Sequence, residues 1–379
     1  CLGIIKQKLN RIEEAQVCFR KAIELKADYA EAYDSLGLTL YELHKLEEAE
    51  FSFKKAIEIK PQFINAQYNF STLLYKIGRI DEAMDILKKT LQLNPDFKPS
   101  LLLIGNIYFE RGKYELALQN FDICNTESSR ALSLASLYAL RRVEDIYERI
   151  NAQSELDSKN LSIAAFSSFI EHKEKKETAN KFCNNPIDFI SISNISSYIE
   201  DLDSFIKEII NELENVKIRW EPLDNTTKNG FHTGNKINLF DKPINKMKDL
   251  QSIIIEELYN YRLKFKKENC SYIKDWPSES FLSGWHVVLK KQGYQKAHIH
   301  PGGWLSGVIY LKVVPDLGRN EGAIEFSLNG NQYFDVDSPN IIYKPNVGDL
   351  ILFPSSLHHK TIPYSTDTNR MIISFDLVP

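Results

Sequence analysis

The spacing of hydrophobic and polar positions changes once along the chain. Up to residue 265, apolar residues mostly recur at intervals of three and four, the spacing that predicts amphipathic helices. After Trp276 and Pro277, short runs rich in Val, Ile, Tyr and Phe are closed by Gly, Pro or Asn, as in FLSGWHVVLK, LSGVIYLKVV, DLILFP and RMIISFDLV. We therefore expect a multidomain α + β protein, with helices first and a compact antiparallel β domain last.

The helical part repeats itself with a period of 34 residues, since residues 30–63 align without a gap on residues 64–97. The pattern continues in both directions, and the aligned positions include Ala32 and Ala66, Tyr41 and Tyr75, Pro61 and Pro95, and Gly3, Gly37 and Gly105. Small residues let two helices cross closely, larger ones fill the seam, and Pro stops the second helix. The pattern resembles the tetratricopeptide repeat, and we expect about four repeats over residues 1–125, the first of them truncated.

A solenoid of such repeats offers a concave groove, so we expect a protein or a peptide to bind there. The alternative is a spacer or a dimerisation surface. From residue 126 to residue 182 the period is lost while the sequence still looks helical, which we interpret as a helical cap or linker. Two more amphipathic helices are predicted at residues 198–213 and 247–265, inside a domain that spans residues 183–379.

Composition narrows the choice of partners and compartment. The net charge is -4 with acids and bases interleaved, so the basic excess that neutralises phosphates is missing and no nucleic acid is expected. The five cysteines are widely spaced without a CxxC pair, which favours reduced thiols. No run approaches the roughly 18 apolar residues of a membrane span, so no membrane is expected as a partner and a cytoplasmic location is favoured. The chain begins at Cys1, so we expect an incomplete N-terminus, with a lost targeting signal as an open alternative.

Candidate chemistry gathers in the predicted β domain, for which we expect a double-stranded β-helix, a jelly-roll or cupin-like barrel with flanking helices. In HIHPGGWLSGVIYLK, the two-residue period of a strand places His298 and His300 on the same side. A third imidazole is available from His358 or His359, in a turn that follows a strand. Arg370 opens an otherwise apolar final strand, and a buried arginine needs a carboxylate or phosphate partner.

Three segments, HIHPGGWLSGVIYL, GDLILFPSSLHHKTIPY and RMIISFD, resemble the Fe(II)- and 2-oxoglutarate-dependent oxygenases. More narrowly, they resemble the oxygenase domain that is found fused to tetratricopeptide repeats. The resemblance implies that His298 and His359 bind Fe(II), that Arg370 binds the distal carboxylate of the co-substrate 2-oxoglutarate, and that Tyr310 hydrogen-bonds it. It favours His359 over His358, because the family's ligand directly precedes a basic residue, a Thr and a Pro, as in HKTIP.

One position departs from that family's pattern. The usual ligands are two histidines and one carboxylate, written His-x-Asp or His-x-Glu, but here the second place is His300. His300 could be the third ligand, or water could fill the place, or a carboxylate could come from elsewhere. Glu325 is the nearest candidate, although strand alternation turns it outward. Because metals bind neutral imidazoles, we expect metal affinity to fall below about pH 6.5.

These features predict a hydroxylase of the dioxygenase class whose repeats recruit a substrate or partner, with Fe(II) as cofactor and 2-oxoglutarate as co-substrate. No further catalytic residue is expected beyond their ligands. Trp285, Trp304 and Ser306 are candidates for substrate binding, and the two tryptophans fit a place in the core equally well. The alternatives are a non-catalytic scaffold with a metal-binding barrel, and a three-histidine dioxygenase that does not use 2-oxoglutarate.

Overall fold

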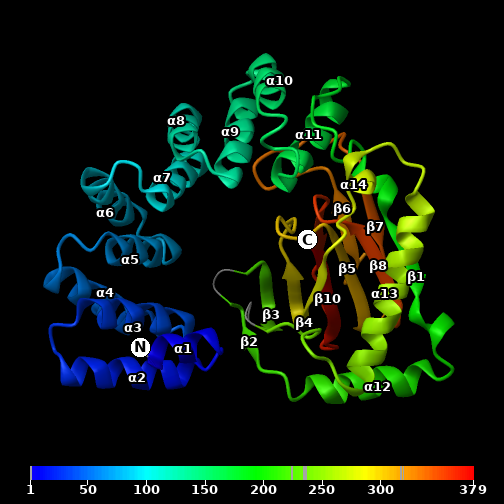
Figure 1. Ribbon diagram of the computed structural model, residues 1–379, viewed down its shortest axis with the longest axis horizontal. Coiled ribbons are helices and arrows are strands. Elements are labelled where there is room, and N and C mark those ends of the chain that lie inside the picture. The colour runs from blue at the N-terminus through cyan, green and yellow to red at the C-terminus, as the bar shows by residue number, and fades with distance from the viewer. Residues whose placement is uncertain (1, 223–224, 234–236, 316–317, 319) are drawn as a thin grey trace. The chain divides into compact units, whose positions relative to one another are not determined.

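The computed structural model describes residues 2–222, 225–233, 237–315, 318 and 320–379 (Figure 1). The chain divides into two compact units, Cys1–Arg142 and Val143–Pro379, here called unit 1 and unit 2. Unit 1 is built of helical repeats and unit 2 contains antiparallel sheets, so the predicted change from helices to a β domain is confirmed. The finer predicted boundaries, after residues 125 and 182, stay a prediction.

The described part of unit 1 consists of helices that pack mainly on their sequence neighbours. They are α1 (Leu2–Lys8), α2 (Ile12–Leu25), α3 (Ala30–Glu42), α4 (Leu46–Ile59), α5 (Ile64–Lys76), α6 (Ile80–Leu93), α7 (Lys98–Glu110), α8 (Tyr114–Cys124) and α9 (Glu127–Ala139). Successive pairs follow the 34-residue period of the sequence, and α9 packs on α8 after the period has ended.

A glycine and a phenylalanine explain why the period is visible in the sequence. A Cβ atom on Gly37 of α3 would lie 2.6 Å from the ring of Phe53 in α4, so only glycine lets the two helices approach with that ring between them. The same contact recurs in the repeats before and after: Gly3 with Phe19, and Gly105 with Phe121. In the remaining repeat the two positions hold Ser71 and Leu87, both fully buried, so a larger residue on one helix accompanies a smaller one on the other.

Unit 2 contains both helices and strands. Its helices are α10 (Val143–Ala152), α11 (Leu161–Glu174), the 3-10 turns η1 (Pro186–Phe189) and η2 (Ile195–Tyr198), α12 (Leu202–Leu213), α13 (Asn245–Phe265) and α14 (Ser271–Lys274). The helix predicted from residue 198 begins only at Leu202, because the side chain of Asp201 accepts a hydrogen bond from Ser204 N–H and caps it. None of the described helices is long and apolar enough to cross a membrane.

The strands of unit 2 form two antiparallel sheets. They are β1 (Ser191–Asn194), β2 (Ile218–Trp220), β3 (Thr227–Thr233), β4 (Phe281–Gln295), β5 (Leu305–Lys312), β6 (Ile324–Ser327), β7 (Asn340–Tyr343), β8 (Asp349–Pro354), β9 (His358–Thr361) and β10 (Arg370–Val378). The larger sheet has the order β1-β8-β5-β10-β4-β3-β2, and the smaller one has the order β7-β6-β9. Most neighbours in the larger sheet are therefore distant in the sequence.

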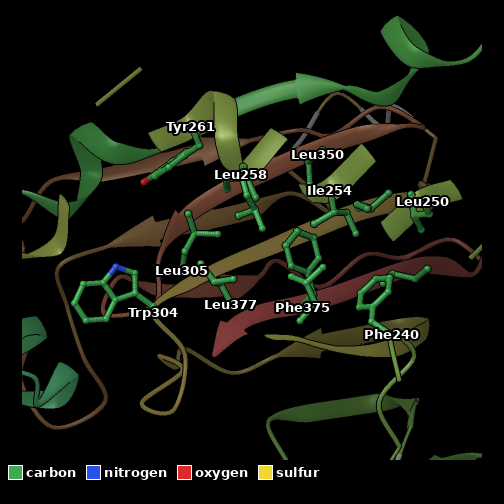
Figure 2. Packing of buried hydrophobic residues seen from close by; sticks show 14 of the residues in the cluster. Phe240, Leu250, Ile254, Leu258, Tyr261, Trp304, Leu305, Leu350, Phe375 and Leu377 are labelled. Atoms are coloured by element: carbon green, nitrogen blue, oxygen red, sulfur yellow. The ribbon is translucent and has the colours of Figure 1, made fainter. Parts of the chain in front are cut away.

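Each face of the larger sheet has a different environment. Figure 2 shows Ile254 and Leu258 of α13 packed over Leu350 and Phe375, in the hydrophobic core of unit 2. Side chains of both sheets line a narrow cavity on the opposite side. Because strand residues alternate, Ile373, Phe375 and Leu377 of β10 face the core, whereas Arg370, Ile372 and Ser374 line that cavity.

Candidate metal centre

Three histidines meet at the mouth of this cavity. His298 and His300 lie in the connection between β4 and β5, and His359 lies in β9 of the smaller sheet. An isolated antiparallel bridge joins the two chain segments: the backbone N–H of His298 donates to the carbonyl of His359 at 3.1 Å, and the reverse bond measures 3.0 Å. One nitrogen atom from each of the three rings lies within 4.8 Å of the others, so the three imidazoles could hold a metal ion.

The hydrogen bonds of the three rings leave the same nitrogen free in each. The Nδ1 atoms of His298 and His359 lie 2.7 Å from the carbonyl oxygen of Lys296 and 3.2 Å from that of Leu357. The Nδ1 atom of His300 lies 2.6 Å from Oδ1 of Asp376. A carbonyl or an ionised carboxylate can only accept, so each Nδ1 carries the proton and each Nε2 keeps its lone pair. Imidazoles that bind metals are usually held in this way.

Burial keeps the rings of His298 and His359 neutral at lower pH than the sequence alone indicates. Burial and then the neighbouring His300 lower the pKa of His298 to about 3, and burial followed by His298 lowers the pKa of His359 well below its ordinary value. Protons then compete with a metal for these rings only in more acidic solution. The expected loss of metal affinity below about pH 6.5 stays a prediction, and the lowered pKa values of these two rings favour a loss in more acidic solution.

Asp376 is the carboxylate that the sequence analysis missed. The hydroxyl of Ser306 lies 2.9 Å from Nδ1 of His300 and donates to Asp376 Oδ1 at 2.7 Å, so Ser306 supports His300 from behind. Asp376 and Ser306 are directly paired across β10 and β5. The alternation of RMIISFD, which places Asp376 on the face of Arg370, could have indicated it. Glu325 instead forms an ion pair of 3.0 Å with Lys360.

Arg370 lies deeper in the same cavity. Its side chain is 1% exposed, and the described residues supply no hydrogen-bond partner for its Nε and Nη1 atoms. The guanidinium carbon lies 4.9 Å from the centre of the Tyr310 ring, and the Tyr310 hydroxyl also lacks a partner among the described residues. Burial raises the pKa of Tyr310 to about 12 although Arg370 acts against it, so the phenol is protonated and can donate. Unpaired buried donors are costly, and an acceptor bound in the cavity would satisfy them.

The remaining predicted residues separate into two groups. Trp285 lines the cavity and packs its ring 5.3 Å from that of His300. Trp304 is 4% exposed and packs against Phe182 in the core, where its indole N–H donates to the Tyr272 carbonyl at 3.0 Å. Of the two places expected for Trp304, this packing favours the core, because the residue lies just before β5 and its ring contacts Phe182 and Tyr272.

Strand register also separates the two adjacent histidines of β9. His359 and Thr361 line the cavity, whereas the ring of His358 lies 5.7 Å from that of Tyr333 and outside the cavity lining. A second, wider cleft adjoins His298 and His300 and is also lined by Trp285, His232, Pro301 and Asp376, among others. The candidate metal centre thus lies between an inner cavity that contains Arg370 and an outer cleft.

Comparison with protein families gives three matches. Residues 283–376 match a family described as "Putative 2OG-Fe(II) oxygenase". Residues 40–96 match a family described as "Tetratricopeptide repeat", and residues 5–44 match one described as "TPR repeat". The predicted combination of tetratricopeptide repeats with a domain similar to 2-oxoglutarate- and Fe(II)-dependent oxygenases is thereby confirmed. The comparison with curated proteins found no match.

Among solved structures, similarity extends to parts of the chain. A Pseudomonas putida prolyl-4-hydroxylase is 11% identical over 50% of this chain and 91% of its own, with a TM-score of 0.36. Pseudomonas aeruginosa pilF is 19% identical over 46% of this chain and 82% of its own, with a TM-score of 0.41. YrrB, described as a TPR protein with an unusual peptide-binding site, is 20% identical over 46% of this chain and 89% of its own, with a TM-score of 0.36.

Proposed function

We propose that unit 2 is an Fe(II)- and 2-oxoglutarate-dependent dioxygenase that hydroxylates a C–H bond, and that unit 1 recruits its substrate or a partner protein. The observation that carries the proposal is Arg370, a buried cation with two unpaired donor atoms in the cavity that the three histidines border. A guanidinium binds a carboxylate through two parallel hydrogen bonds, and 2-oxoglutarate has a carboxylate at the end distant from its metal-binding atoms.

The residues present fit the two groups that this chemistry requires. The Nε2 lone pairs of His298, His300 and His359 suit a divalent transition metal such as Fe(II). When bound together, Fe(II) and 2-oxoglutarate supply the oxidation in which O2 and 2-oxoglutarate yield succinate, CO2 and a hydroxylated product. The protein supplies orientation and a water-poor cavity, since organic cofactors and metals carry the oxidation itself.

Each residue has a defined part in the proposal. Arg370 binds the distal carboxylate of 2-oxoglutarate, and the protonated Tyr310 hydroxyl donates a further hydrogen bond to it. Asp376 and Ser306 orient His300 by accepting from its Nδ1 and by holding each other. Trp285 forms part of the wall between the inner cavity and the outer cleft, where a substrate C–H bond would approach.

The proposed substrate is a protein or peptide side chain, because repeat solenoids bind peptides along their surface. This choice rests on the general behaviour of such repeats. The test below follows the co-substrate 2-oxoglutarate, so it does not require the substrate to be identified.

The deciding experiment incubates the purified chain with Fe(II), O2 and 2-oxoglutarate and measures succinate and CO2. We expect equal amounts of both, and their loss in Arg370→Gln. Bound metal without any succinate would favour a metal-binding barrel. Oxidation of another compound that needs metal and oxygen but no 2-oxoglutarate would favour a three-histidine dioxygenase of a different kind.

A further inference from the structure

Two cysteines far apart in the sequence meet in unit 2. Cys183 precedes η1, and Cys270 directly precedes α14. Backbone hydrogen bonds hold their segments together: Ser271 N–H donates to the Lys181 carbonyl at 3.0 Å and Tyr272 N–H donates to the Phe182 carbonyl at 2.9 Å. Both thiols are free, the two cysteines adjoin these paired segments, and each thiol influences the pKa of the other. The proposed oxygenase chemistry uses neither of them.

The two thiols have different environments. Cys183 is 2% exposed in the core, and burial raises the pKa of its thiol well above the ordinary value. Cys270 is partly exposed. The neighbouring Cys183 side chain, followed by the backbone N–H groups of Ile273 and Tyr272, lowers the pKa of its thiol to about 7, although burial acts in the opposite direction. At neutral pH a large fraction of Cys270 is therefore thiolate, the nucleophilic form, while Cys183 remains a thiol beside it.

We propose that Cys183 and Cys270 are an oxidation site, at which a peroxide converts the two thiols into a reversible disulfide. The geometry points to this pair because backbone hydrogen bonds join the residues next to a partly exposed thiol to the residues next to a second, buried thiol. A second thiol nearby can resolve the first oxidation product before further oxidation. The proposal does not depend on the function proposed for the metal centre.

The reaction balances with hydrogen peroxide as the oxidant. The Cys270 thiolate attacks one peroxide oxygen, so an S–O bond forms, the O–O bond breaks, and the departing hydroxide takes a proton to become water. The sulfur of Cys183 then displaces the hydroxyl group from Cys270, which leaves as water with the Cys183 proton while the S–S bond forms. The two thiols lose two electrons in total, and a dithiol reductant restores them.

The surroundings hold the two cysteine-bearing segments in place before oxidation. The Phe182 ring packs 5.6 Å from the ring of Tyr272, and the Ser168 hydroxyl donates to the Cys183 carbonyl at 2.8 Å. Tyr272 in turn stacks on Trp304 at 6.1 Å and accepts its indole N–H. The disulfide would therefore lock a segment that packs directly beneath the start of β5 and the connection that carries His300.

Peptide mapping of the full chain tests the proposal. Reduced, desalted protein is treated with a small excess of hydrogen peroxide, blocked with iodoacetamide and digested, and the peptides are identified by mass spectrometry with and without dithiothreitol. We expect a peptide pair linked through Cys183 and Cys270 that dithiothreitol separates. A variant with Cys18→Ser and Cys124→Ser removes two cysteines of unit 1 and should give the same linked pair.

A second measurement removes one partner at a time. In Cys183→Ser, which keeps a hydroxyl donor beside Cys270 but cannot form a disulfide, Cys270 should accumulate as a sulfenic acid that dimedone traps. Cys270→Ser should leave Cys183 unmodified. In the wild type, iodoacetamide should label Cys270 with a half-maximal rate near pH 7. The proposal is overturned if peroxide-treated wild type yields both cysteines separately alkylated, or Cys270 oxidised without a link, or Cys270 linked to a cysteine other than Cys183.

Discussion

Units 1 and 2 make contacts over very different distances in the sequence. In unit 1 the main contacts join consecutive helices, such as α3 with α4 and α7 with α8. In unit 2 the central strand β10 pairs with β4 and β5, and β1 pairs with β8. Local contacts leave a periodic record in the sequence, whereas contacts between distant strands leave only fragments. The repeats can therefore be recognised by counting, while the metal centre has to be assembled from separate segments.

The largest effect is expected at the candidate metal centre, where histidines from two distant segments of unit 2 meet. His359→Ala removes the one imidazole of the candidate centre that β9 supplies, and we expect it to abolish metal loading. His358→Ala, its neighbour, should retain the metal because it lies outside the cavity lining. Titration with Mn(II) or anaerobic Fe(II), followed by metal analysis of the desalted protein, distinguishes them. Loss of metal from His358→Ala instead would mean that the register of β9 is wrong.

Acid should destabilise unit 2 more than unit 1, which contains only the exposed His44 as a histidine. Burial lowers the pKa of His358 from 6.5 to about 4, so its contribution is present above pH 6.5 and is lost as pH falls toward 4. The difference between these two pKa values corresponds to a loss of about 3 kcal/mol in the free energy of unfolding. As the pH is lowered from 6.5 to 4, the free energy of unfolding of the metal-free protein should decrease less steeply in His358→Gln than in the wild type.

All four tryptophans, Trp220, Trp276, Trp285 and Trp304, lie in unit 2, so their fluorescence in urea reports its unfolding. Measurements at several pH values between 4.5 and 7 give the slope. Equal slopes in the wild type and in His358→Gln would contradict a neutral, buried His358.

Arg370→Gln should remove the response of unit 2 to 2-oxoglutarate while keeping its response to metal. Saturation at about 100 times the dissociation constant stabilises the folded form by about 2.7 kcal/mol, a rise of roughly 5 to 11 °C in melting temperature for a unit of this size. Mn(II) replaces Fe(II) to prevent turnover. Arg370→Lys should recover part of the rise, since one ammonium cannot form two parallel hydrogen bonds.

The ligand-free Arg370→Gln protein is the control for folding. It should melt no lower than the wild type, because the change removes a buried, unpaired charge. A wild type that responds to metal and not to 2-oxoglutarate would contradict the role of Arg370.

Asp376→Asn tests the carboxylate behind His300. An amide can still accept through its oxygen but no longer carries charge, so we expect metal affinity to fall about 10- to 100-fold. Glu325→Gln is the matched control. Glu325 lies on β6, next to β9, and forms an ion pair with Lys360, the residue that follows His359. Isothermal titration with Mn(II) measures both. Unchanged affinity in Asp376→Asn, or an equal loss in Glu325→Gln, would argue against a positioning role.

The smallest expected effect concerns a contact within one repeat of unit 1. Gly37→Ser places a side chain against the Phe53 ring and should destabilise unit 1 by about 1 to 3 kcal/mol. Adding Phe53→Leu gives this repeat the residues that the next repeat has at the equivalent positions, Ser71 and Leu87. The double variant should recover most of the lost stability. Urea unfolding followed by far-UV circular dichroism measures it, and the tryptophan transition of unit 2 should not move. A double variant less stable than Gly37→Ser would show that the two pairs are not interchangeable.

The sequence by itself determined the features that depend on short separations. The 34-residue period identified the helical repeats, because glycine and phenylalanine meet within one repeat. The two-residue period of strands placed His298 and His300 together, and the change of period marked the β domain. The resemblance to oxygenases added His359, Arg370 and Tyr310, all of which line the cavity.

Only the tertiary structure decided which residues support these ones. Asp376 reaches His300 because β10 pairs with β5, and Trp304 lies in the core because the distant residues Phe182 and Tyr272 pack against it, facts that no local pattern contains. Cys183 and Cys270 meet for the same reason. Burial also changed the chemistry, since the pKa of His298 depends on the removal of water by distant segments. Residue type and spacing are properties of the chain, whereas solvation and cross-strand neighbours arise only when distant segments pack together.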